Sequence, residues 1–371
     1  MLRTGIFGTS CKENEKRIPL HPDMLMDIED SIKPYLYFEK GYAKDYGLND
    51  VFFKKNFGGV FERDDLFDNT DLWILPKPSK TDFKFFRKGK ILWGWPHCVQ
   101  GHEITQAAID CEMTVIAWEA MYGGADNIHA FQKNNEIAGY AAVHHMMMLS
   151  GKNGYFGSSL KAAVLGYGST GKGAVHALQG LGINDIDVFT KRPPHLIAGS
   201  PMGVNIGEIS NTDDGIVLSI KKDTNKASKI LGNYNIVVNC VLQDPLSPLN
   251  FVNKDELQDL KCVTEIIDVS CDRGMGFFFA QPTNMNEPVI KVPRSNINYY
   301  SVDHTPTIYW DASSYQISKV LLFYISDMVK NDWRNNDVLL NAAEIIDGRV
   351  VNSKIIGFQG REMEFPHSIK V

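Results

Sequence analysis

The chain has 371 residues, 44% of them hydrophobic and 22% charged, a balance that predicts a folded protein with more than one hydrophobic core. Its formal net charge of -6 at pH 7 lacks the cationic excess that phosphate-backbone binding requires, so nucleic acid is not an expected partner. The sequence has neither a charged leader nor an apolar run of about 18 residues, which argues against secretion and membrane insertion.

The cysteines indicate the cellular compartment in which the protein is expected. Six of them are scattered along the sequence, without the paired spacing that is typical of metal ligands. Free thiols of this kind favour a reducing compartment. We therefore expect a cytoplasmic protein with no metal site.

Short apolar runs alternate with helical stretches in the first third of the chain. The expected strands are Thr4–Phe7, Tyr35–Phe38, Leu72–Leu75, Ile91–Trp95 and Met113–Ala117, and the expected helices are His21–Ile32 and His102–Cys111. This alternation predicts a parallel sheet of the α/β class. A long helix, Asn134–Leu149, follows and could connect two domains.

A second alternating pattern begins after that helix. Its expected strands are Lys161–Leu165, Asp185–Thr190, Asn235–Val241, Cys262–Val269 and Ile297–Val302. A helix at Ala312–Val329 could return the chain to the first domain, and the last ~40 residues are expected to form turns and short strands.

A glycine loop follows the first strand of this second pattern. It reads Gly166-Tyr-Gly168-Ser169-Thr170-Gly171 and opens a helix that reaches Leu181. The first glycine permits a tight turn, the second lets the backbone approach a pyrophosphate, and the third lets helix and strand pack closely. With a strand on either side, the loop predicts a nicotinamide dinucleotide site; the alternative is a plain glycine-rich turn.

The end of the next strand predicts which dinucleotide binds. An acid there usually holds the ribose 2′-hydroxyl of NAD, but this sequence has Thr190-Lys191-Arg192. Two cations suit a 2′-phosphate, so NADP(H) is expected to be preferred and NAD(H) remains possible. Asp187 lies inside the strand and is a poorer candidate, and the alternative for the two cations is a solvated loop.

Reduction of a carbonyl or imine by hydride needs a cation for the substrate carboxylate and a proton donor. Arg17 follows the first strand, and its planar fork suits a carboxylate. Lys77 and His97 each follow a later apolar strand, the position at which parallel sheets place ligand groups. An imidazole titrates near neutral pH, which makes His97 the expected proton relay.

These residues resemble the alanine dehydrogenase/pyridine nucleotide transhydrogenase family over about residues 3–330. The motifs that carry the resemblance are Glu15-Lys-Arg17, Pro76-Lys77-Pro78, His97, Asn135-Glu-Ile-Ala-Gly139, the glycine loop and Val269-Ser-Cys-Asp272-Arg273-Gly. Within that family, Ser301-Val-Asp-His304-Thr-Pro306, Asn239-Cys240-Val241-Leu-Gln-Asp244 and Thr190-Lys-Arg look closer to the N5-(carboxyethyl)ornithine synthase branch. The Asp-His-x-Pro pattern is also similar to lysine-forming saccharopine dehydrogenases.

The resemblance implies two Rossmann-like doubly wound domains, with a dinucleotide-binding domain (134–305) inserted into a substrate domain (1–133 and 306–371). Catalysis would occur in the cleft between them. Lys77, His97 and Asp272 would be catalytic, and Arg17, Lys77, Arg273 and His304 would bind substrate. The cofactor would contact the glycine loop, Thr190–Arg192, Cys240 and Val241. The resemblance also implies a homo-oligomer.

Two features depart from the alanine dehydrogenase pattern. Arg273 replaces a neutral glutamine, and His304 accompanies Asp303 before Pro306. The expected function is therefore NADPH-dependent reduction of the imine formed from an amino acid of the ornithine or lysine type and a 2-oxo acid such as pyruvate. The alternatives are alanine dehydrogenase with NADH and ammonia, a saccharopine dehydrogenase-like enzyme, and a catalytically silent NAD(P)-binding protein.

Overall fold

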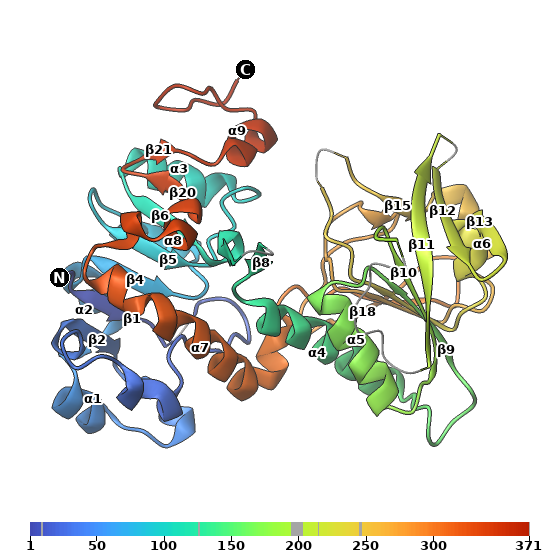
Figure 1. Cartoon of the computed structure of the whole chain (residues 1–371), viewed down its shortest axis with the longest axis horizontal. Coiled ribbons are helices and arrows are strands. Elements are labelled where there is room, and N and C mark those ends of the chain that lie inside the picture. Colours follow the sequence, from blue (N-terminus) through green and yellow to red (C-terminus); the bar gives the residue numbers. More distant parts are fainter. Residues whose placement is uncertain (9, 125–126, 194–202, 214, 245–246, 371) are drawn as a thin grey trace. The chain divides into compact units, whose positions relative to one another are not determined.

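The chain forms two compact units (Figure 1). A computed structural model describes residues 1–8, 10–124, 127–193, 203–213, 215–244 and 247–370. Unit 1 comprises Met1–Gln132 and Trp310–Val371, and unit 2 comprises Lys133–Tyr309. Unit 2 is thus inserted into unit 1, and the two junctions lie at 132/133 and 309/310, where the sequence predicted 133/134 and 305/306.

Unit 1 is built on an eight-stranded sheet. In spatial order its strands are β21 (Arg349–Val350), β20 (Ala343–Ile346), β6 (Thr114–Ala117), β5 (Ile91–Gly94), β4 (Leu72–Leu75), β1 (Thr4–Ile6), β2 (Leu36–Glu39) and β3 (Gly59–Phe61). The strands from β6 to β3 are parallel, whereas β20 and β21 add an antiparallel edge. The order reverses between β1 and β4, which is the arrangement of a doubly wound sheet.

Successive residues of the unit 1 strands enter two different hydrophobic cores, one on each face of the sheet. Ile74 packs in the core that contains Leu321 of α7, and Leu75 packs in the core that contains Ala108 of α3. This is why the strands are apolar at nearly every position. The α-helices of unit 1 are α1 (Asp50–Asn56), α2 (Arg63–Asn69), α3 (His102–Asp110), α7 (Trp310–Val329), α8 (Asp337–Asn341) and α9 (Ser353–Gln359).

Short elements complete unit 1. They are the 3₁₀ helices Pro22–Asp27, Lys33–Tyr35, Lys44–Tyr46, Lys80–Phe85, Trp118–Ala120 and Trp333–Asn335, and the two-stranded ribbon of β7 (Tyr122–Gly123) and β8 (Ile128–His129).

Unit 2 repeats the same winding in a nine-stranded sheet. In spatial order its strands are β13 (Asp223–Lys226), β12 (Gly215–Ile220), β11 (Val204–Thr212), β10 (Asp185–Thr190), β9 (Lys161–Leu165), β14 (Ile236–Asn239), β16 (Glu265–Asp268), β19 (Asn298–Tyr300) and β18 (Val289–Lys291). The strands from β11 to β19 are parallel, and the order reverses between β9 and β14. β12, β13 and β18 are antiparallel additions.

Close helix packing on one face of this sheet depends on glycine. A side-chain carbon at Gly139 of α4 would lie 2.0 Å from the carbonyl oxygen of Thr170, and one at Gly173 of α5 would lie 1.8 Å from that of Glu136. The two helices therefore approach with backbone against backbone. The remaining elements are α4 (Gln132–Ser150), α5 (Ser169–Gly180), α6 (Ala227–Leu231), β15 (Asn250–Val252), β17 (Gly276–Phe277) and the 3₁₀ helices Lys254–Asp259 and Thr305–Tyr309.

The predicted α/β class with parallel, doubly wound sheets is confirmed. The helix predicted at His21–Ile32 is wrong in type and length, because the chain forms a 3₁₀ helix at Pro22–Asp27 and is extended at Ile28. Met24 and Leu25 are nevertheless buried, so the apolar residues identified a packed segment but not its conformation. Within the described ranges, no helix combines the length and the apolar character that crossing a bilayer requires.

Candidate active site

In unit 1, three predicted site residues follow strands on either side of the point where the sheet order reverses. Arg17 lies in the loop after β1, Lys77 directly follows β4, and His97 follows β5. Ligands of doubly wound sheets bind beyond the carboxyl ends of the strands at this point. The fold therefore places these three side chains at the usual ligand-binding edge of unit 1.

Lys77 and His97 are in direct contact, because Nζ of the lysine lies 2.8 Å from Nε2 of the imidazole. Glu119 holds the other side of His97: its Oε1 accepts the backbone N–H of His97 at 2.6 Å and lies 3.6 Å from Nδ1. With Lys77 as the donor, Nε2 is an acceptor and the imidazole proton resides on Nδ1, facing the carboxylate. The His97 backbone has φ +52°, so a non-glycine residue is held here in the left-handed region.

Glu119 is partly exposed, and it interacts electrostatically with a buried carboxylate, Glu344 of β20. Burial, and next the charge of Glu344, raise the pKa of Glu119. Burial likewise raises the pKa of Glu344, whose Oε1 accepts a hydrogen bond from Asn352. Among the described residues, neither Glu119 nor Glu344 has a hydrogen-bond partner for its buried Oε2. The surroundings of Glu119 and Glu344 therefore favour the protonated form of these carboxyl groups.

This arrangement predicts the pH dependence of stability. The folded chain retains a proton on Glu119 at pH values where an unfolded chain has lost it, so stability decreases as pH rises above the ordinary carboxyl pKa of 4.5. A Glu119→Gln variant is always neutral and keeps an acceptor for His97. Thermal unfolding between about pH 5 and pH 8 should show a smaller fall in Tm for this variant than for wild type, and a higher Tm at the upper end.

Glu103→Gln is the matched control, because Glu103 is an exposed carboxylate paired with Lys80. Its Tm should follow the wild-type pH dependence. Identical pH slopes for wild type and Glu119→Gln would show that Glu119 ionises normally in the folded chain.

Arg17 is paired with Glu15 inside the unit rather than on the surface. Its Nε donates to Glu15 Oε1 at 2.7 Å, its Nη2 lies 2.5 Å from Oε2, and the guanidinium lies 5.1 Å from the ring centre of Trp95. Arg17 is only 4% exposed. Although burial raises it, the charges of Arg17 and Lys77 lower the pKa of Glu15. Two guanidinium nitrogens of Arg17, Nε and Nη2, are thus bonded to Glu15 rather than available to a substrate carboxylate.

In unit 2, the glycine loop lies where the sheet order reverses between β9 and β14. Gly166 has φ +89°, and a side-chain carbon on it would lie 2.8 Å from the carbonyl oxygen of Cys240. One on Gly171 would lie 2.1 Å from the carbonyl oxygen of Gly166, whereas one on Gly168 would meet nothing within 4 Å among the described residues. Packing therefore requires glycine at positions 166 and 171, whereas Gly168 leaves its backbone accessible to a ligand.

The groups around the loop fit a bound pyrophosphate. Gly168 is the N-cap of α5, so the N–H groups of Ser169 and Thr170 stand in the first turn of the helix, where an anion is favoured. Cys240 and Val241 follow β14 and lie beside Gly166. The loop has the cradle shape and the donors that a dinucleotide requires.

Thr190 ends β10, Lys191 and Arg192 follow it, and Arg192 contacts the same loop. Arg192 donates from Nη2 to the carbonyl oxygen of Tyr167 at 2.6 Å, and its backbone N–H donates to the Thr190 hydroxyl at 3.2 Å. Lys191 and Arg192 are exposed, and Thr190 is buried. The guanidinium is thus anchored against the glycine loop.

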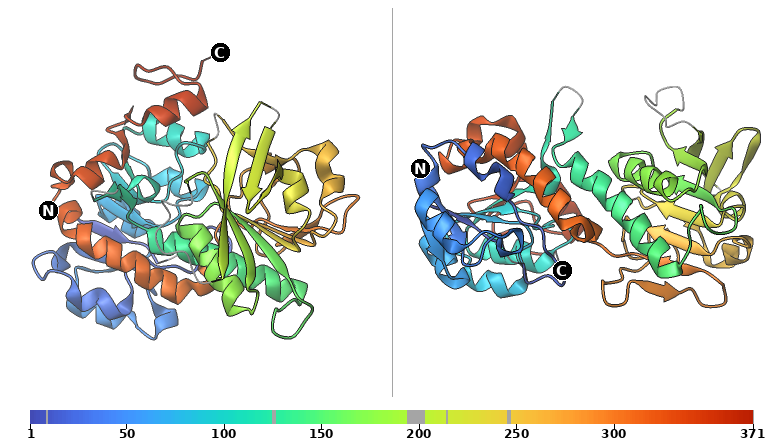
Figure 2. Two further views of the ribbon diagram at one scale, coloured as in Figure 1. Left: turned by 45° about the vertical axis from the view of Figure 1, so that its right-hand side comes forward. Right: turned by 90° about the horizontal axis from the view of Figure 1, so that it is seen from below.

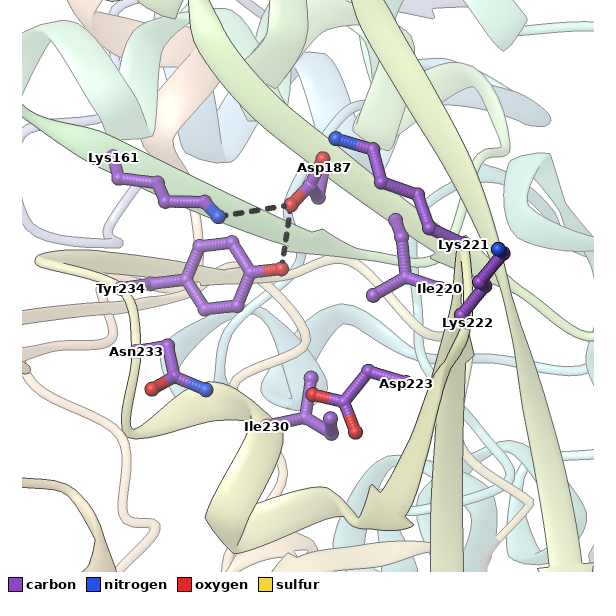
Figure 3. Close-up of a pocket in the computed structure, with 9 residues that line it drawn as sticks. All are labelled: Lys161, Asp187, Ile220, Lys221, Lys222, Asp223, Ile230, Asn233 and Tyr234. Atoms are coloured by element: carbon purple, nitrogen blue, oxygen red, sulfur yellow. Dashed lines mark hydrogen bonds and ion pairs between the residues drawn. The ribbon is translucent and has the colours of Figure 1, made fainter.

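Asp187 lies at the opposite edge of the sheet, in the cavity shown in Figure 3. The cavity has a volume of about 530 Å³ and is lined in part by Lys161, the first residue of β9. Asp187 accepts hydrogen bonds from Tyr234 and Asn205. Although burial raises it, these bonds and the Lys161 ammonium lower the pKa of Asp187. Asp187 therefore has its partners at Asn205, Tyr234 and Lys161, and it lies inside β10 rather than at the strand end that carries Arg192.

Asp272 and Arg273 follow β16, and His304 follows β19. Asp272 is half-buried, and burial raises its pKa, whereas Arg273 is exposed. His304 is 3% exposed, and its Nδ1 lies 2.6 Å from Asp303 Oδ1. The histidine is thus oriented by the neighbouring carboxylate.

The predicted residues form two groups, one in each unit. Unit 1 brings together Arg17, Lys77 and His97, and unit 2 brings together the glycine loop, Arg192, Cys240 and Val241. The sequence interpretation missed Glu15 and Glu119 as parts of the site. Glu119 follows β6 at the same edge as Lys77 and His97, so the strand-end rule could have identified it.

Comparisons with known proteins agree with this fold. The family model described as "Alanine dehydrogenase/PNT, C-terminal domain" matches residues 136–353. An N(5)-(carboxyethyl)ornithine synthase of Clostridium botulinum is 23% identical, with 82% of this chain and 88% of the relative covered. An alanine dehydrogenase of Mycobacterium tuberculosis is 21% identical over 99% of this chain and all of the relative. A solved L-alanine dehydrogenase has the same fold, with a TM-score of 0.76 at 17% identity over 96% of this chain and 98% of that one.

Proposed function

We propose, from the premise that the chain belongs to the alanine dehydrogenase/PNT family of pyridine-nucleotide-dependent oxidoreductases, that it reduces the imine of an amino acid and a 2-oxo acid. The amine is of the ornithine or lysine type, the oxo acid resembles pyruvate, and the donor is NADPH. The observation that carries the proposal is the 2.8 Å contact between Lys77 Nζ and His97 Nε2 beside the Arg17–Glu15 pair.

Lys77 is the group best suited to the oxo-acid carboxylate. Lys77 is partly exposed, whereas Arg17 is buried and its guanidinium is held by Glu15. The positive charge of Arg17 offsets the negative charge of Glu15. The positive charge of Lys77 therefore remains as the net attraction for an anion. In this proposal Lys77 binds the carboxylate directly, and Arg17 contributes only its charge from the buried pair with Glu15.

His97 and Lys77 move the protons. Condensation of the amine with the oxo acid releases water, and the departing hydroxyl needs a proton that the Lys77–His97 pair can deliver. Glu119 accepts the backbone N–H of His97 and lies beside Nδ1, so it fixes the orientation of the imidazole while Nε2 takes a proton from the attacking amine. The bound reduced nicotinamide supplies the hydride that converts the imine to a secondary amine.

Unit 2 binds the cofactor through the glycine loop, Ser169, Thr170, Cys240 and Val241. Asp272 is the carboxylate proposed to orient the amine, and Arg273 and His304 are proposed to recognise the carboxylate of a larger amino acid. An exposed cation such as Arg273 has no use when the amine is ammonia. We also expect a homo-oligomer, as the family resemblance implies.

Lys191 and Arg192 are proposed to select NADPH. Charge-assisted hydrogen bonds contribute about 1.5–3 kcal/mol each, so replacing both residues with alanine should lower kcat/KM for NADPH by about 100-fold or more, with little change for NADH. Steady-state kinetics with the two cofactors measure this. Lys172→Ala is a suitable control, because Lys172 is an exposed cation on α5. A wild-type preference for NADH would contradict the assignment.

Alanine dehydrogenase is the second candidate, since relatives with that name cover nearly the whole chain. A saccharopine dehydrogenase-like reaction, with a longer oxo acid, and a catalytically silent NAD(P)-binding protein are the others. A screen of cofactor oxidation with several 2-oxo acids and with ornithine, lysine, other amino acids and ammonia separates them. The proposal predicts turnover with pyruvate and a diamine amino acid. Turnover with ammonia alone supports alanine dehydrogenase, and cofactor binding without turnover supports the silent protein.

A further inference from the structure

The C-terminal segment packs against the loop that carries His97, yet the mechanism above gives it no role. Helix α9 lies beside α3 in Figures 1 and 2. Its Ile355 is fully buried in the core that also contains Cys98 and Ala108. The end of the chain therefore belongs to the same packed body as the residues that follow β5.

A direct link is made by Gln359, the last residue of α9. Its Nε2 donates to the carbonyl oxygen of Cys98 at 2.7 Å and lies 3.3 Å from that of Val99. The Thr105 hydroxyl donates to the same Cys98 carbonyl at 2.8 Å. Gln359 is 4% exposed and Thr105 is fully buried. The carbonyl group of the residue after His97 is thus fixed by two buried donors.

Arg361 orients the amide of Gln359. Its Nε donates to Gln359 Oε1 at 2.6 Å, while Nη1 donates to Gln106 Oε1 at 2.8 Å and to the carbonyl oxygen of His367 at 3.0 Å. An arginine can only donate, so the amide oxygen must face it and the amide nitrogen must face Cys98. Arg361 is 1% exposed, which excludes competing water.

The conformation of His97 explains why such support is useful. A left-handed φ of +52° is unfavourable for a residue with a side chain, so the peptide groups on both sides must be held. Glu119 accepts the His97 N–H, and the Gly101 N–H donates to the His97 carbonyl at 2.8 Å. Gln359 holds the next peptide group along the chain. Together these bonds determine where Nε2 meets Lys77.

We propose that Gln359 is a positioning residue for His97: it acts through the Cys98 carbonyl to hold the imidazole against Lys77. This inference rests on the proposed function only for its effect on turnover. Its effect on the geometry of His97 can be measured without substrate.

The test uses Gln359→Met, which keeps the length of the side chain but cannot donate, and Thr105→Val, which removes the second donor to Cys98. Misplacement of a reacting group by about 1 Å can cost up to about 100-fold, so we expect kcat to fall about tenfold in each variant, while the KM for the oxo acid and the Kd for NADPH change little. The pH profile of kcat should also shift, because the contact between Lys77 and His97 is altered.

Ile355→Val is the control, since it loosens the same helix without removing a hydrogen-bond donor to the Cys98 carbonyl. It should lower Tm while leaving kcat and its pH profile at the wild-type values. If Gln359→Met does not fold, Thr105→Val carries the test. Wild-type kcat and pH profile in the folded donor-less variants would overturn the proposal.

A nuclear magnetic resonance titration of His97 separates this inference from the proposed function. The His97 signal, assigned through His97→Gln, should titrate differently in Gln359→Met and Thr105→Val than in wild type and Ile355→Val. This result would support the positioning role even if the wild-type enzyme turned over no oxo acid and amine, an outcome that would refute the proposed function alone. Superimposable titrations in all four proteins would overturn the positioning role, whatever the activity.

Discussion

Replacing His97 with glutamine lowers kcat by about 10²- to 10⁴-fold, the range expected when a general acid–base group is lost. Glutamine retains an acceptor or donor near Lys77, but it cannot gain and release a proton. The KM for the oxo acid should change little, because His97 does not anchor the carboxylate. Replacing Lys77 with methionine should instead raise that KM strongly and lower kcat as well, because Lys77 both binds the carboxylate and contacts His97. Steady-state kinetics with varied oxo acid distinguish the two patterns.

The matched controls for these substitutions are His102→Gln and Lys80→Met. Both residues are exposed and follow the same strands, β5 and β4, as the residues they control for. Both control variants should retain wild-type kinetics. A His97→Gln variant with nearly full activity would remove His97 from the proposed mechanism, and an unchanged KM in Lys77→Met would remove the carboxylate role of Lys77.

Substituting Gly171 with alanine abolishes tight cofactor binding. The added carbon would lie 2.1 Å from the carbonyl oxygen of Gly166, so the loop or α5 must move. Overpacking of this kind costs about 1–3 kcal/mol, and because the displaced group is the cradle itself, the cost falls on binding. The Kd for NADPH should rise by about 10- to 100-fold. Calorimetry or nicotinamide fluorescence measures the change, and circular dichroism verifies that unit 2 remains folded.

Gly180→Ala is the control within the same helix. Among the described residues, nothing lies within 4 Å of the carbon that this substitution adds. Alanine is also the better helix former, so Tm should stay constant or rise while Kd is unchanged. Normal NADPH affinity in Gly171→Ala would show that the cofactor does not use this turn.

Local sequence patterns were sufficient for the parallel strands that are buried on both faces, because these read as continuous apolar runs. The parallel strands β3 and β11, which are partly exposed, were not predicted. The strands Lys161–Leu165 and Asp185–Thr190 were predicted with the bounds that the structure has. The antiparallel strands β12 and β13 were not predicted, and β20 was expected only as one of the short strands in the last ~40 residues. Several of their residues are polar and exposed, and β20 pairs with β6 from the far end of the chain, so no local pattern reveals it.

Part of the candidate site was likewise readable from the sequence. Lys77 and His97 follow apolar strands, and their contact arises because β4 and β5 are neighbours in a parallel sheet. The partners of those residues were not readable. From the sequence, Glu15 was named only as part of a motif, and its buried pairing with Arg17 was not predicted. Glu344 and Gln359 reach the site only through long-range packing of the C-terminal segment.

The most direct test of the account is to identify the product formed from pyruvate, ornithine and NADPH that carries deuterium as its transferable hydride. We predict a secondary amine whose mass is that of the two substrates less water plus one deuteride and one proton. The deuterium should lie on the carbon that carried the oxo group. Deuterated alanine, formed only when ammonia is present and with no adduct of ornithine or lysine, would contradict the account.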